Sequence, residues 1–546
     1  MRKNIQGLLI AVIKNALRDS GAQEKDYGDL FLDIPADSRF GDLSVNIAMK
    51  LASALKNPPL QIADNLVTNI KKHLEKALFR AYIKEVKVEG AGFINFYLSD
   101  SYFCDGLVDI LRQGSVALKV NLGKGKPVLL EFVSANPTGP LSVAHARQAA
   151  VGDVLANILS FLRFKVKKEY YLNDEGNQIN ILGRSIELRL KELNGERVEF
   201  PEDHYQGDYI IDIAGEIKAK NIKVTDFCAY GVEYIMNIIK GELADFGVRF
   251  DYWYSQKKLR ESGKITKTLD ALKKKGFLYE QEGALWFKST LFGDDKDRVV
   301  IKSDGSYTYL APDIAYHADK FKRGFQWLIN MWGPDHHGYI NRLKAAVAAL
   351  GHDPKSLSII IVQLASIFRE GKPVQMSTRR GQYITLREVL DEVGVDASRF
   401  FFLMRRTSSH LDFDLDTAKK QTAENPVYYV QYAHARITSI INNSPVKFKI
   451  KDAPLYLLKE KEEAELIRKI WQFSYILEVC LETEDPYMLT VYLQELAQGF
   501  HKFYDLHRVL GDDLALTQAR LALLLATKTV IATAMGLLAI SLPEKM

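Results

Sequence analysis

The apolar positions at the start of the chain recur with helical spacing. They fall on one stripe of a helix: Ile5, Leu8, Leu9, Val12, Ile13, Ala16 and Leu17. Lys14 and Arg18 interrupt the apolar run, and no small-x-small cleavage site follows it. The pattern therefore predicts an amphipathic first helix rather than a secretory signal.

The rest of the first 115 residues mixes helical and strand patterns. The turn at residues 39–42 leads into a predicted helix through Ala54, which two prolines end because proline lacks the amide proton that a helix needs. Residues 86–88 and 93–97 alternate between apolar and polar side chains around a glycine-containing turn, which predicts a half-buried β-hairpin. A small α/β domain is therefore expected here.

A different pattern begins near residue 127. Residues 127–133 form a compact apolar run, typical of a strand in a parallel sheet, and a turn rich in proline and glycine follows at 136–140. A long helix is predicted from His145 to Leu162, and residues 166–172 form the next strand. Strand, glycine-containing turn, helix and strand are the opening of a doubly wound, Rossmann-like nucleotide-binding fold.

The later segments complete the expected organisation. Residues 175–290 are charged and largely helical and suggest an insertion, and strand patterns return at 327–331 and 358–364. From Pro426 onward nearly every segment has the pattern of an amphipathic helix, which predicts a helical bundle. The sequence thus predicts a multidomain α/β protein. Its expected domains are a small α/β domain at 1–115, a doubly wound parallel-sheet domain at 116–425, and an all-α domain at 426–546.

One apolar stretch, residues 521–542, is long enough to span a bilayer. Lys528 and several threonine and serine residues interrupt it, and a charged side chain inside a bilayer is costly. We therefore expect a buried helix pair within the helical domain, and no membrane partner.

Composition changes this picture little. A chain of 546 residues is too long for one compact domain, and 47% hydrophobic with 26% charged residues is ordinary for a folded protein. Lys and Arg number 73 against 68 Asp and Glu, a net charge of +5 that only weakly suggests a nucleic-acid partner. Cys104, Cys228 and Cys480 lie too far apart for a C-x-x-C metal pair and fit the reducing cytoplasm.

The turn after the first parallel strand is the first place to look for chemistry, because ligands of open parallel sheets bind beyond the carboxyl ends of the strands. A helix N-terminus there would point backbone N–H groups at a phosphate, and His145 could donate a hydrogen bond to phosphate oxygens. The periodicity is also that of a capping turn with a surface histidine. The residues alone leave both interpretations open.

Several segments carry a resemblance to a known family: residues 131–153, 169–178, 335–338, 375–379, 425–436 and 542–546. The first closely resembles the first signature of class I aminoacyl-tRNA synthetases, specifically of the arginyl-tRNA synthetases. The others are similar to that family, in the same order along essentially the whole chain. Each segment is moderately specific, whereas the ordered set is highly specific.

The resemblance implies an arginine–tRNA ligase that activates L-arginine with ATP to arginyl-adenylate and pyrophosphate, then transfers arginine to the 3′ end of its tRNA. Such a reaction needs positioned reactants and neutralisation of charge on phosphate oxygens. The implied catalytic residues are His145, Ser142, Ser377, Thr378 and Arg379. The implied ATP-binding residues are Ala144, His145, Asp335, His336, His337, Gln375 and Met376. Mg²⁺ would enter with ATP, and no protein-bound metal is expected.

Recognition of arginine requires carboxylates and well-placed acceptors, because a guanidinium presents five donors in a flat fork. By the resemblance, Glu131, Ser134 and Asn136 contact the ammonium and carboxylate ends of the amino acid. Tyr309 and Asp313, which share one helical face, bind the guanidinium. Paired hydrogen bonds discriminate strongly for such a substrate, so a separate editing domain is unnecessary in principle.

The flanking domains resemble the tRNA-binding parts of the family. The N-terminal domain is implied to contact the outer corner of tRNA, and the C-terminal domain resembles the anticodon-binding domain. Tyr428 and Tyr432 could stack on unpaired bases and Arg436 could pair with phosphate, although a tyrosine run is also typical of a helix-packing core. A cytoplasmic monomer is expected.

Three departures from the family pattern bear on ATP binding. Ser142 stands at the first histidine of His-x-Gly-His, Ala144 at its glycine, and Gln375 at the first lysine of the implied phosphate-binding loop. Each lost charge-assisted contact would cost on the order of 1.5–3 kcal/mol, so weaker ATP binding is expected. Arg147, Arg379 and Arg380 are expected to compensate with positive charge.

Other matches fail. Residues 123–127 lack the spacing of a phosphate-binding Walker loop, and Asp412, Asp414 and Asp416 lack the glycine and glutamate of a calcium loop. The sequence is compatible with two alternative functions. One is a small-molecule adenylyltransferase of the same fold. The other is a non-catalytic tRNA-binding regulator descended from a synthetase, which the departures at Ser142 and Ala144 favour.

Overall fold

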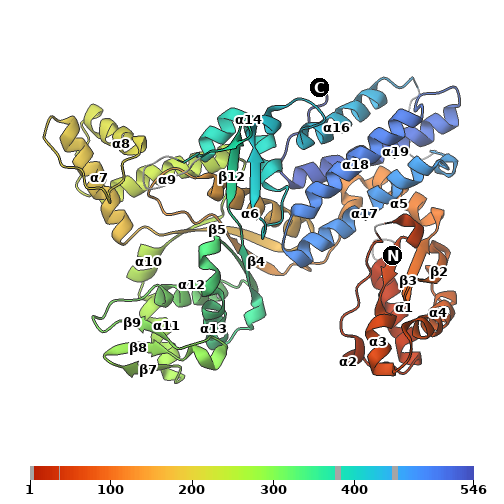
Figure 1. Cartoon of the computed structure of the whole chain (residues 1–546), viewed down its shortest axis with the longest axis horizontal. Helices are drawn as coiled ribbons and strands as arrows, with labels where there is room; N and C mark the ends of the chain where they lie inside the picture. The colour runs from red at the N-terminus through yellow and green to blue at the C-terminus, as the bar shows by residue number, and fades with distance from the viewer. Residues whose placement is uncertain (1–4, 36, 375–382, 446–452) are drawn as a thin grey trace. The chain divides into compact units, whose positions relative to one another are not determined.

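The computed structural model describes residues 5–35, 37–374, 383–445 and 453–546 (Figure 1). The chain divides into two compact units. Unit 1 comprises residues 1–118, 437–473 and 499–530, and unit 2 comprises residues 119–436, 474–498 and 531–546. The four long helices of the C-terminal region each carry residues of both units: α16 (Pro426–Asn442), α17 (Lys461–Thr483), α18 (Tyr487–Leu506) and α19 (Leu514–Leu537).

Unit 1 contains an antiparallel sheet in the order β1-β3-β2. Its strands and helices are α1 (Ile5–Asp19), α2 (Glu24–Tyr27), β1 (Leu43–Val45), α3 (Ile47–Leu55), α4 (Pro59–Glu75), β2 (Ile83–Glu89), β3 (Phe93–Leu98) and α5 (Asp100–Gln113). The predicted first helix and hairpin are confirmed, since α1 buries its apolar stripe and β2 pairs with β3. Short strand β1 was not predicted, because the expected helix began at its position.

Gly41 explains how β1 approaches the hairpin. Its φ is +95°, and a Cβ atom at this position would lie 2.9 Å from the carbonyl oxygen of Phe96. A side chain is therefore excluded both by backbone conformation and by space. The next residue, Asp42, accepts a hydrogen bond from the Leu98 N–H at 2.8 Å and forms an ion pair with Arg468 at 2.9 Å.

The centre of unit 2 is a five-stranded sheet in the order β11-β10-β4-β5-β6, with every neighbouring pair parallel. Its strands are β4 (Pro127–Glu131), β5 (Lys165–Leu172), β6 (Tyr252–Ser255), β10 (Trp327–Trp332) and β11 (Leu357–Ile361). The predicted strands at 127, 166, 327 and 358 are thereby confirmed, together with the doubly wound fold. Strand β6 lies within the range 175–290, where the charged helical pattern concealed it.

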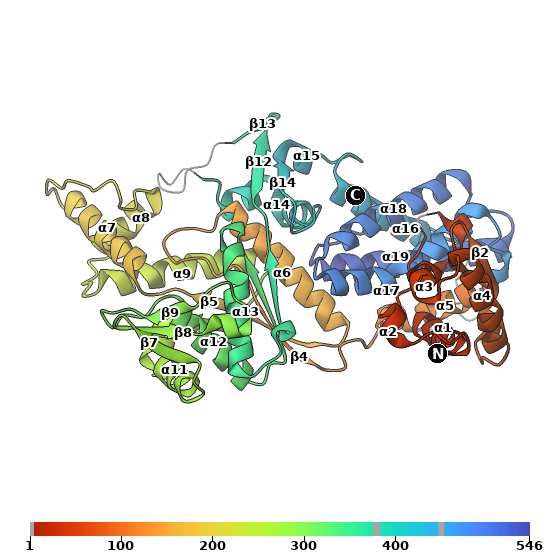
Figure 2. The ribbon, with the colours of Figure 1, turned by 60° about the horizontal axis from the view of Figure 1, so that its bottom comes forward.

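Helices cover both faces of this sheet. Strands β4 and β5 are joined through α6 (Val143–Phe161), and β10 and β11 through α13 (Ile340–Leu350). Because these two crossovers run in opposite directions from the centre, right-handed connections place their helices on opposite faces, as Figure 2 shows for α6 and α13. Leu129, Leu328 and Leu357 form a core with α13 and with α12 (Leu310–Lys322).

The remaining elements of unit 2 complete the domain. They are α7 (Asn177–Leu193), α8 (Asp208–Ala219), α9 (Phe227–Asp245), α10 (Gln256–Glu261), α11 (Lys264–Lys274), β7 (Leu278–Gln281), β8 (Ala284–Phe287), β9 (Arg298–Ile301), β12 (Ala365–Arg369), β13 (Lys372–Pro373), α14 (Leu386–Phe402), β14 (Leu411–Asp414) and α15 (Leu415–Lys419). Strands β7, β8 and β9 form one small sheet, and β13, β12 and β14 another.

A fully buried arginine joins distant parts of unit 2. Arg399 on α14 is 0% exposed and forms an ion pair with Asp153 of α6 at 2.6 Å. Its other nitrogens donate to the carbonyl oxygens of Phe246 at 2.9 Å and Leu538 at 2.7 Å. One side chain therefore connects α14 with α6, with the end of α9 and with the final segment of unit 2.

The apolar stretch near the end forms one helix, α19, so the expected helix pair is wrong. Of the described helices, α19 is long and apolar enough to cross a membrane, but 67% of its most apolar window is buried inside the structure. Its threonines satisfy their hydroxyls locally: Thr527 donates to the carbonyl of Leu523 at 2.9 Å. This is the behaviour of a core helix, in agreement with the predicted burial.

Candidate active site

The chain order of the five-stranded sheet reverses between β10 and β4. At such a switch point the loops after the two strands diverge and leave a crevice beyond their carboxyl ends. Of the residues predicted to bind arginine and ATP, those that the structure describes follow these two strands or lie on α12, which precedes β10. These residues therefore lie in the part of the fold where a ligand is expected.

The turn after β4 is strained. Val133 and Ser134 both have positive φ, +68° and +39°, a conformation that a β-branched residue rarely adopts. The turn buries Glu131 to 7% exposure and directs the Ser134 hydroxyl to donate to Glu131 Oε1 at 3.3 Å. The same hydroxyl accepts from the Tyr171 N–H at 3.1 Å. Glu131 and Ser134, which were predicted together as contacts for the ends of the amino acid, are thus hydrogen-bonded to each other.

Asn136 lies two residues after Ser134 and is exposed. Its amide nitrogen donates to Gln178 Oε1 at 2.7 Å, and its amide oxygen accepts from Asn173 at 3.3 Å. Both partners belong to the segment 169–178 that was singled out for its family resemblance. The structure therefore assigns that segment a role in orienting Asn136.

His145 lies on the first turn of α6, whose N-cap residue is Ser142. The backbone N–H of Ser142 donates to Nδ1 of His145 at 3.2 Å, and the Ser142 hydroxyl lies 3.1 Å from the same nitrogen. Burial lowers the pKa of His145 to about 4. At neutral pH the ring is therefore uncharged, and with Nδ1 accepting, the proton resides on Nε2 as a hydrogen-bond donor.

Two expectations about this helix change. Its first N–H groups were expected to point at a phosphate, but the N–H of Val143 donates to the carbonyl oxygen of Ile384 at 3.3 Å. Arg147 is 0% exposed, and its guanidinium donates to the backbone carbonyls of Gln363, Leu364, Arg406 and Ser409 at 2.8–3.3 Å. The expectation that Arg147 supplies positive charge to ATP is therefore wrong, because its guanidinium binds four loop carbonyls instead.

Asp313 lies on the first turn of α12 and is half-buried. The hydroxyl of Tyr339 donates to Asp313 Oδ2 at 2.7 Å. Burial raises the pKa of Asp313 to about 7, and the negative charge of Glu131 adds to the increase. Tyr309, the N-cap residue of the same helix, is 82% exposed. Tyr339 was missed from the sequence, although it closely follows the segment 335–338.

A polar network behind the site was also missed. Lys320, at the buried end of the same helix face, forms an ion pair with Glu131 Oε2 and donates to Asn330 Oδ1 at 3.0 Å. The Asn330 amide nitrogen lies 2.9 Å from His317 Nε2. The signal that could have revealed it is the helical spacing of Asp313, His317 and Lys320, which continues the predicted pair.

The turn after β10 carries the second group of predicted ATP-binding residues. Asp335, His336 and His337 lie on a short 3₁₀ helix (Pro334–Tyr339) and are exposed. His336 lies 3.5 Å from Asp335 and 6.0 Å, between ring centroids, from Trp332. Gln375, Met376, Ser377, Thr378, Arg379 and Arg380 lie outside the described residues.

The predicted base-stacking residues form a column on α16. The rings of Tyr428 and Tyr432 are parallel within 8° at a centroid distance of 6.2 Å. The guanidinium of Arg436 lies 5.1 Å from the Tyr432 ring. Tyr428 also lines a cavity of about 600 Å³ together with Gln431 and Met546.

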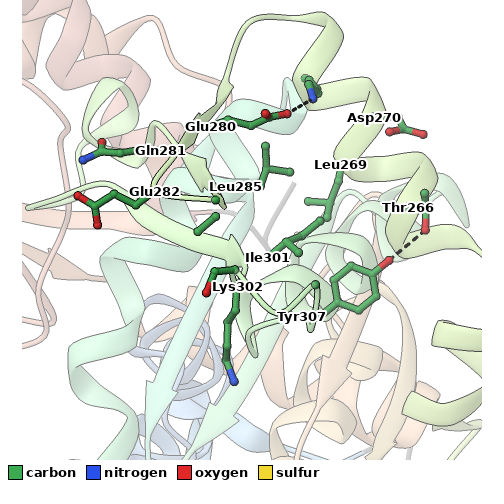
Figure 3. Close-up of a pocket in the computed structure, with 15 residues that line it drawn as sticks. Thr266, Leu269, Asp270, Glu280, Gln281, Glu282, Leu285, Ile301, Lys302 and Tyr307 are labelled. Atoms are coloured by element: carbon green, nitrogen blue, oxygen red, sulfur yellow. Dashed lines mark hydrogen bonds and ion pairs between the residues drawn. The ribbon is translucent and has the colours of Figure 1, made fainter.

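Another hollow, of about 470 Å³, lies between α11 and the small sheet β7-β8-β9 (Figure 3). Its wall combines charged side chains with apolar ones, as Figure 3 shows for Glu280, Leu285, Ile301 and Lys302. None of the predicted site residues that the structure describes lines it. It is therefore separate from the predicted site.

Family models cover nearly the whole chain. Residues 7–98 match the arginyl tRNA synthetase N terminal domain, residues 107–443 the catalytic domain of tRNA synthetases class I (R), and residues 430–546 the DALR anticodon binding domain. The catalytic-domain match alone spans more than half of the chain.

Relatives and solved structures agree with these matches. The arginine–tRNA ligases of Citrifermentans bemidjiense and Geobacillus kaustophilus are 45% and 44% identical to the chain, with 100% of each chain covered. A putative arginyl-tRNA synthetase structure from Campylobacter jejuni has a TM-score of 0.75 at 38% identity, over 82% of this chain and 100% of that one. Arginyl-tRNA synthetase from Thermus thermophilus has a TM-score of 0.78 at 22% identity, over 99% and 100%.

These full-length matches favour a ligase over the two alternatives, an adenylyltransferase that ignores tRNA and a non-catalytic regulator. The chain therefore belongs to the arginyl-tRNA synthetase family of class I aminoacyl-tRNA synthetases, the arginine–tRNA ligases.

Proposed function

We propose that the chain activates L-arginine with ATP in the crevice between the ends of β4 and β10 and then transfers it to tRNA. The observation that carries the proposal is the pair of carboxyl groups at this switch point. Glu131 is held by Ser134, and Asp313 is held by the Tyr339 hydroxyl. Carboxyl groups with fixed orientations are what a cationic, forked substrate requires.

The two ends of arginine would be recognised by different groups. Glu131, Ser134 and Asn136 follow β4 and would contact the ammonium and carboxylate ends. Asp313 would bind the guanidinium, and Tyr309, which is exposed at the start of α12, would close over it. Because Asp313 already accepts a hydrogen bond from Tyr339 on one oxygen, its other oxygen remains for the substrate.

ATP would lie along the turns at the N-terminus of α6 and after β10. The uncharged His145 ring would donate its Nε2 proton to a phosphate oxygen, supported by Ser142. Ala144 would border the adenine, with Asp335, His336 and His337 facing the nucleotide from β10. Gln375, Met376, Ser377, Thr378 and Arg379 would contact the pyrophosphate, and Mg²⁺ would arrive with ATP as part of the substrate.

The flanking regions would bind tRNA. Residues 1–115 would contact its outer corner and residues 426–546 its anticodon. The parallel rings of Tyr428 and Tyr432 continue into the Arg436 guanidinium, which is the arrangement that stacks on an unpaired base and ends at a phosphate. We further propose that the enzyme acts as a monomer in the cytoplasm, without a membrane partner.

Arginine-dependent exchange between ATP and pyrophosphate, with and without cognate tRNA, tests the proposal. The full chain should exchange with arginine, and Asp313→Asn should raise the arginine KM at least tenfold while changing the ATP KM little, because one charge-assisted contact is lost. Asp270→Asn, at an exposed aspartate of α11, is the matched control. An unchanged arginine KM in Asp313→Asn would remove Asp313 from the arginine site.

A further inference from the structure

A buried ammonium group lies directly behind the proposed arginine site. Lys320 is 0% exposed and forms an ion pair with Glu131 Oε2. Its Nζ atom also donates to Asn330 Oδ1 at 3.0 Å and lies 4.2 Å from the centroid of the Tyr316 ring. Three partners on β4, β10 and α12 therefore surround one positive charge.

This charge requires an explanation, because it is unfavourable in two ways. Burying an ammonium group costs several kcal/mol unless it is fully paired. In addition, a fixed cation next to Glu131 opposes the binding of a cationic substrate to that carboxylate. A purely structural lysine would serve as well elsewhere on the sheet. Its place beside a predicted substrate contact points to a function in the site.

Lys320 is not a temporary occupant of the substrate position. An ammonium that arginine displaces would have to give up the Asn330 oxygen and the Tyr316 ring as well as Glu131. Both of those partners are buried, at 1% and 2% exposure. Leaving them without a cation would be costly, so the ammonium stays in place when the site is filled.

The contacts continue from Lys320 to the backbone of Asp313, the residue that carries the second carboxyl group. Asn330 accepts from Lys320 with its oxygen and therefore turns its NH₂ group to His317 Nε2, at 2.9 Å. Burial and the charge of Lys320 lower the pKa of His317 to about 3, so the ring is neutral. Its Nδ1–H then donates to the carbonyl oxygen of Asp313 at 2.8 Å. In this series of hydrogen bonds, from Lys320 through Asn330 and His317 to Asp313, each donor therefore faces an acceptor.

We propose that Lys320 is a positioning residue for arginine: it binds Oε2 of Glu131, leaves Oε1, which Ser134 also contacts, directed to the substrate, and fixes Glu131 relative to the backbone of Asp313 through Asn330 and His317. This inference rests on the proposed roles of Glu131 and Asp313 in arginine binding. It means that the two acidic groups act as a pair with a set separation rather than as two independent contacts.

The proposal has a consequence that a structural role lacks. Two carboxyl groups near each other in a buried site do not both remain ionised unless a cation is present. The positive charge of Lys320 lowers the pKa of Asp313, so without it more of Asp313 would hold a proton, which arginine must expel on binding. The other titratable groups facing Glu131 are Asp313, Tyr171 and Tyr316, and burial raises the pKa of both tyrosines far above neutrality, so they stay protonated.

The test is the number of protons released when arginine binds, measured by calorimetry at pH 7 in buffers of different ionisation enthalpy. Lys320→Met should bind arginine at least tenfold more weakly and release more protons than the unmodified chain, with the ATP KM within about twofold. Lys322→Met, at an exposed lysine of the same helix, should match the unmodified chain in both respects.

Two further variants keep the outcomes distinct. Asn330→Ala retains the ammonium but breaks its connection to His317, and should weaken arginine binding severalfold even if Lys320→Met does not fold. Glu131→Gln tests the underlying function: unchanged arginine binding in this variant would overturn the role of Glu131, and the role of Lys320 with it. Weakened binding in Glu131→Gln, with unchanged affinity and proton release in Lys320→Met or Asn330→Ala, would overturn the Lys320 proposal alone.

Discussion

Arginine affinity should depend on pH through Asp313. The pKa of this carboxyl is raised from 3.8 to about 7, first by burial and then by the negative charge of Glu131. Arginine keeps its guanidinium charge at every pH at which the protein is folded. Because the guanidinium requires the ionised carboxylate, arginine binding and the loss of a proton from Asp313 are the same event near neutrality.

The size of the effect follows from this pKa. With a value of about 7 in the free protein, roughly 9% of Asp313 is ionised at pH 6 and roughly 91% at pH 8. The apparent Kd for arginine should therefore fall about tenfold between pH 6 and pH 8, and most of the change should occur below pH 7.5. Neighbouring titratable groups do not add to the effect, because they keep their charge state between pH 6 and pH 8. The pKa values of Tyr339 and Tyr171 are raised far above neutrality, and the pKa of His317 is lowered to about 3.

The assay is calorimetric titration of the full chain with arginine from pH 6 to pH 8, with citrulline as the comparison ligand. Citrulline shares the ammonium and carboxylate ends but has an uncharged urea group, so the ratio of the two affinities removes any titration of the shared ends. That ratio should rise about tenfold across the range, and Asp313→Asn should abolish the rise. A ratio that is independent of pH in the unmodified chain would refute the argument.

The raised pKa of Asp313 also lowers the free energy of unfolding at high pH. Between pH 3.8 and about 7 folded Asp313 retains a proton that the unfolded chain has released, so stability falls as pH rises through this window. The loss at pH 8 is at most about 4 kcal/mol. Asp313→Asn should therefore raise the Tm at pH 8 and leave it nearly unchanged at pH 4. A lower Tm at pH 8 would contradict the sign of the shift.

Other substitutions test the surroundings of the site. Gly152→Ala gains about 1 kcal/mol of helix propensity but places a Cβ 2.4 Å from the Phe132 ring, so a net loss of roughly 1–2 kcal/mol is expected by urea denaturation. Gly241→Ala, where nothing lies within 4 Å of the new Cβ, should instead stabilise the protein by up to about 1 kcal/mol. Equal changes in unfolding free energy for the two variants would show that the Phe132 ring moves aside without cost. Restoring the family pattern with Ser142→His and Ala144→Gly should lower the ATP KM roughly tenfold in pyrophosphate exchange. An unchanged ATP KM would mean that the present residues already bind ATP as well.

The fold was predictable where patterns are long. The strands that begin at residues 127 and 327 are buried along most of their length, and their apolar runs identified them to within a few residues. The strands that begin at 165 and 357 are only partly buried but were also located to within a few residues. Strands β1 and β6 have only three and four residues, too few for an alternation to stand out from the neighbouring helical pattern. The predicted helix pair failed for a related reason, because scattered threonines in α19 bond to their own helix and do not interrupt it.

For the proposed site, the sequence indicated the candidate substrate contacts but not the residues behind them. Glu131 and His145 lie in a segment with a recognisable local pattern, whereas Asp313 was named only through the family resemblance. Lys320 pairs with Glu131 across 189 positions, and no local pattern reports a contact at that separation. Arg147 shows the opposite error, since an arginine next to a phosphate-site histidine suggested an exposed charge. Only the packing of the loops at 363 and 406–409 around it revealed a structural role.

The division of the chain into interleaved segments has a consequence for the time course of folding. Asp42 of unit 1 forms its ion pair with Arg468, 426 positions later. At a synthesis rate of about 5–20 residues per second, the first α/β segment waits on the order of 20–85 s before this partner has been made. In the complete fold burial raises the pKa of Asp42, and the positive charge of Arg468 opposes that rise. During that interval the nascent N-terminal segment lacks this ion pair, and the length of the interval is set by the rate of synthesis on the ribosome.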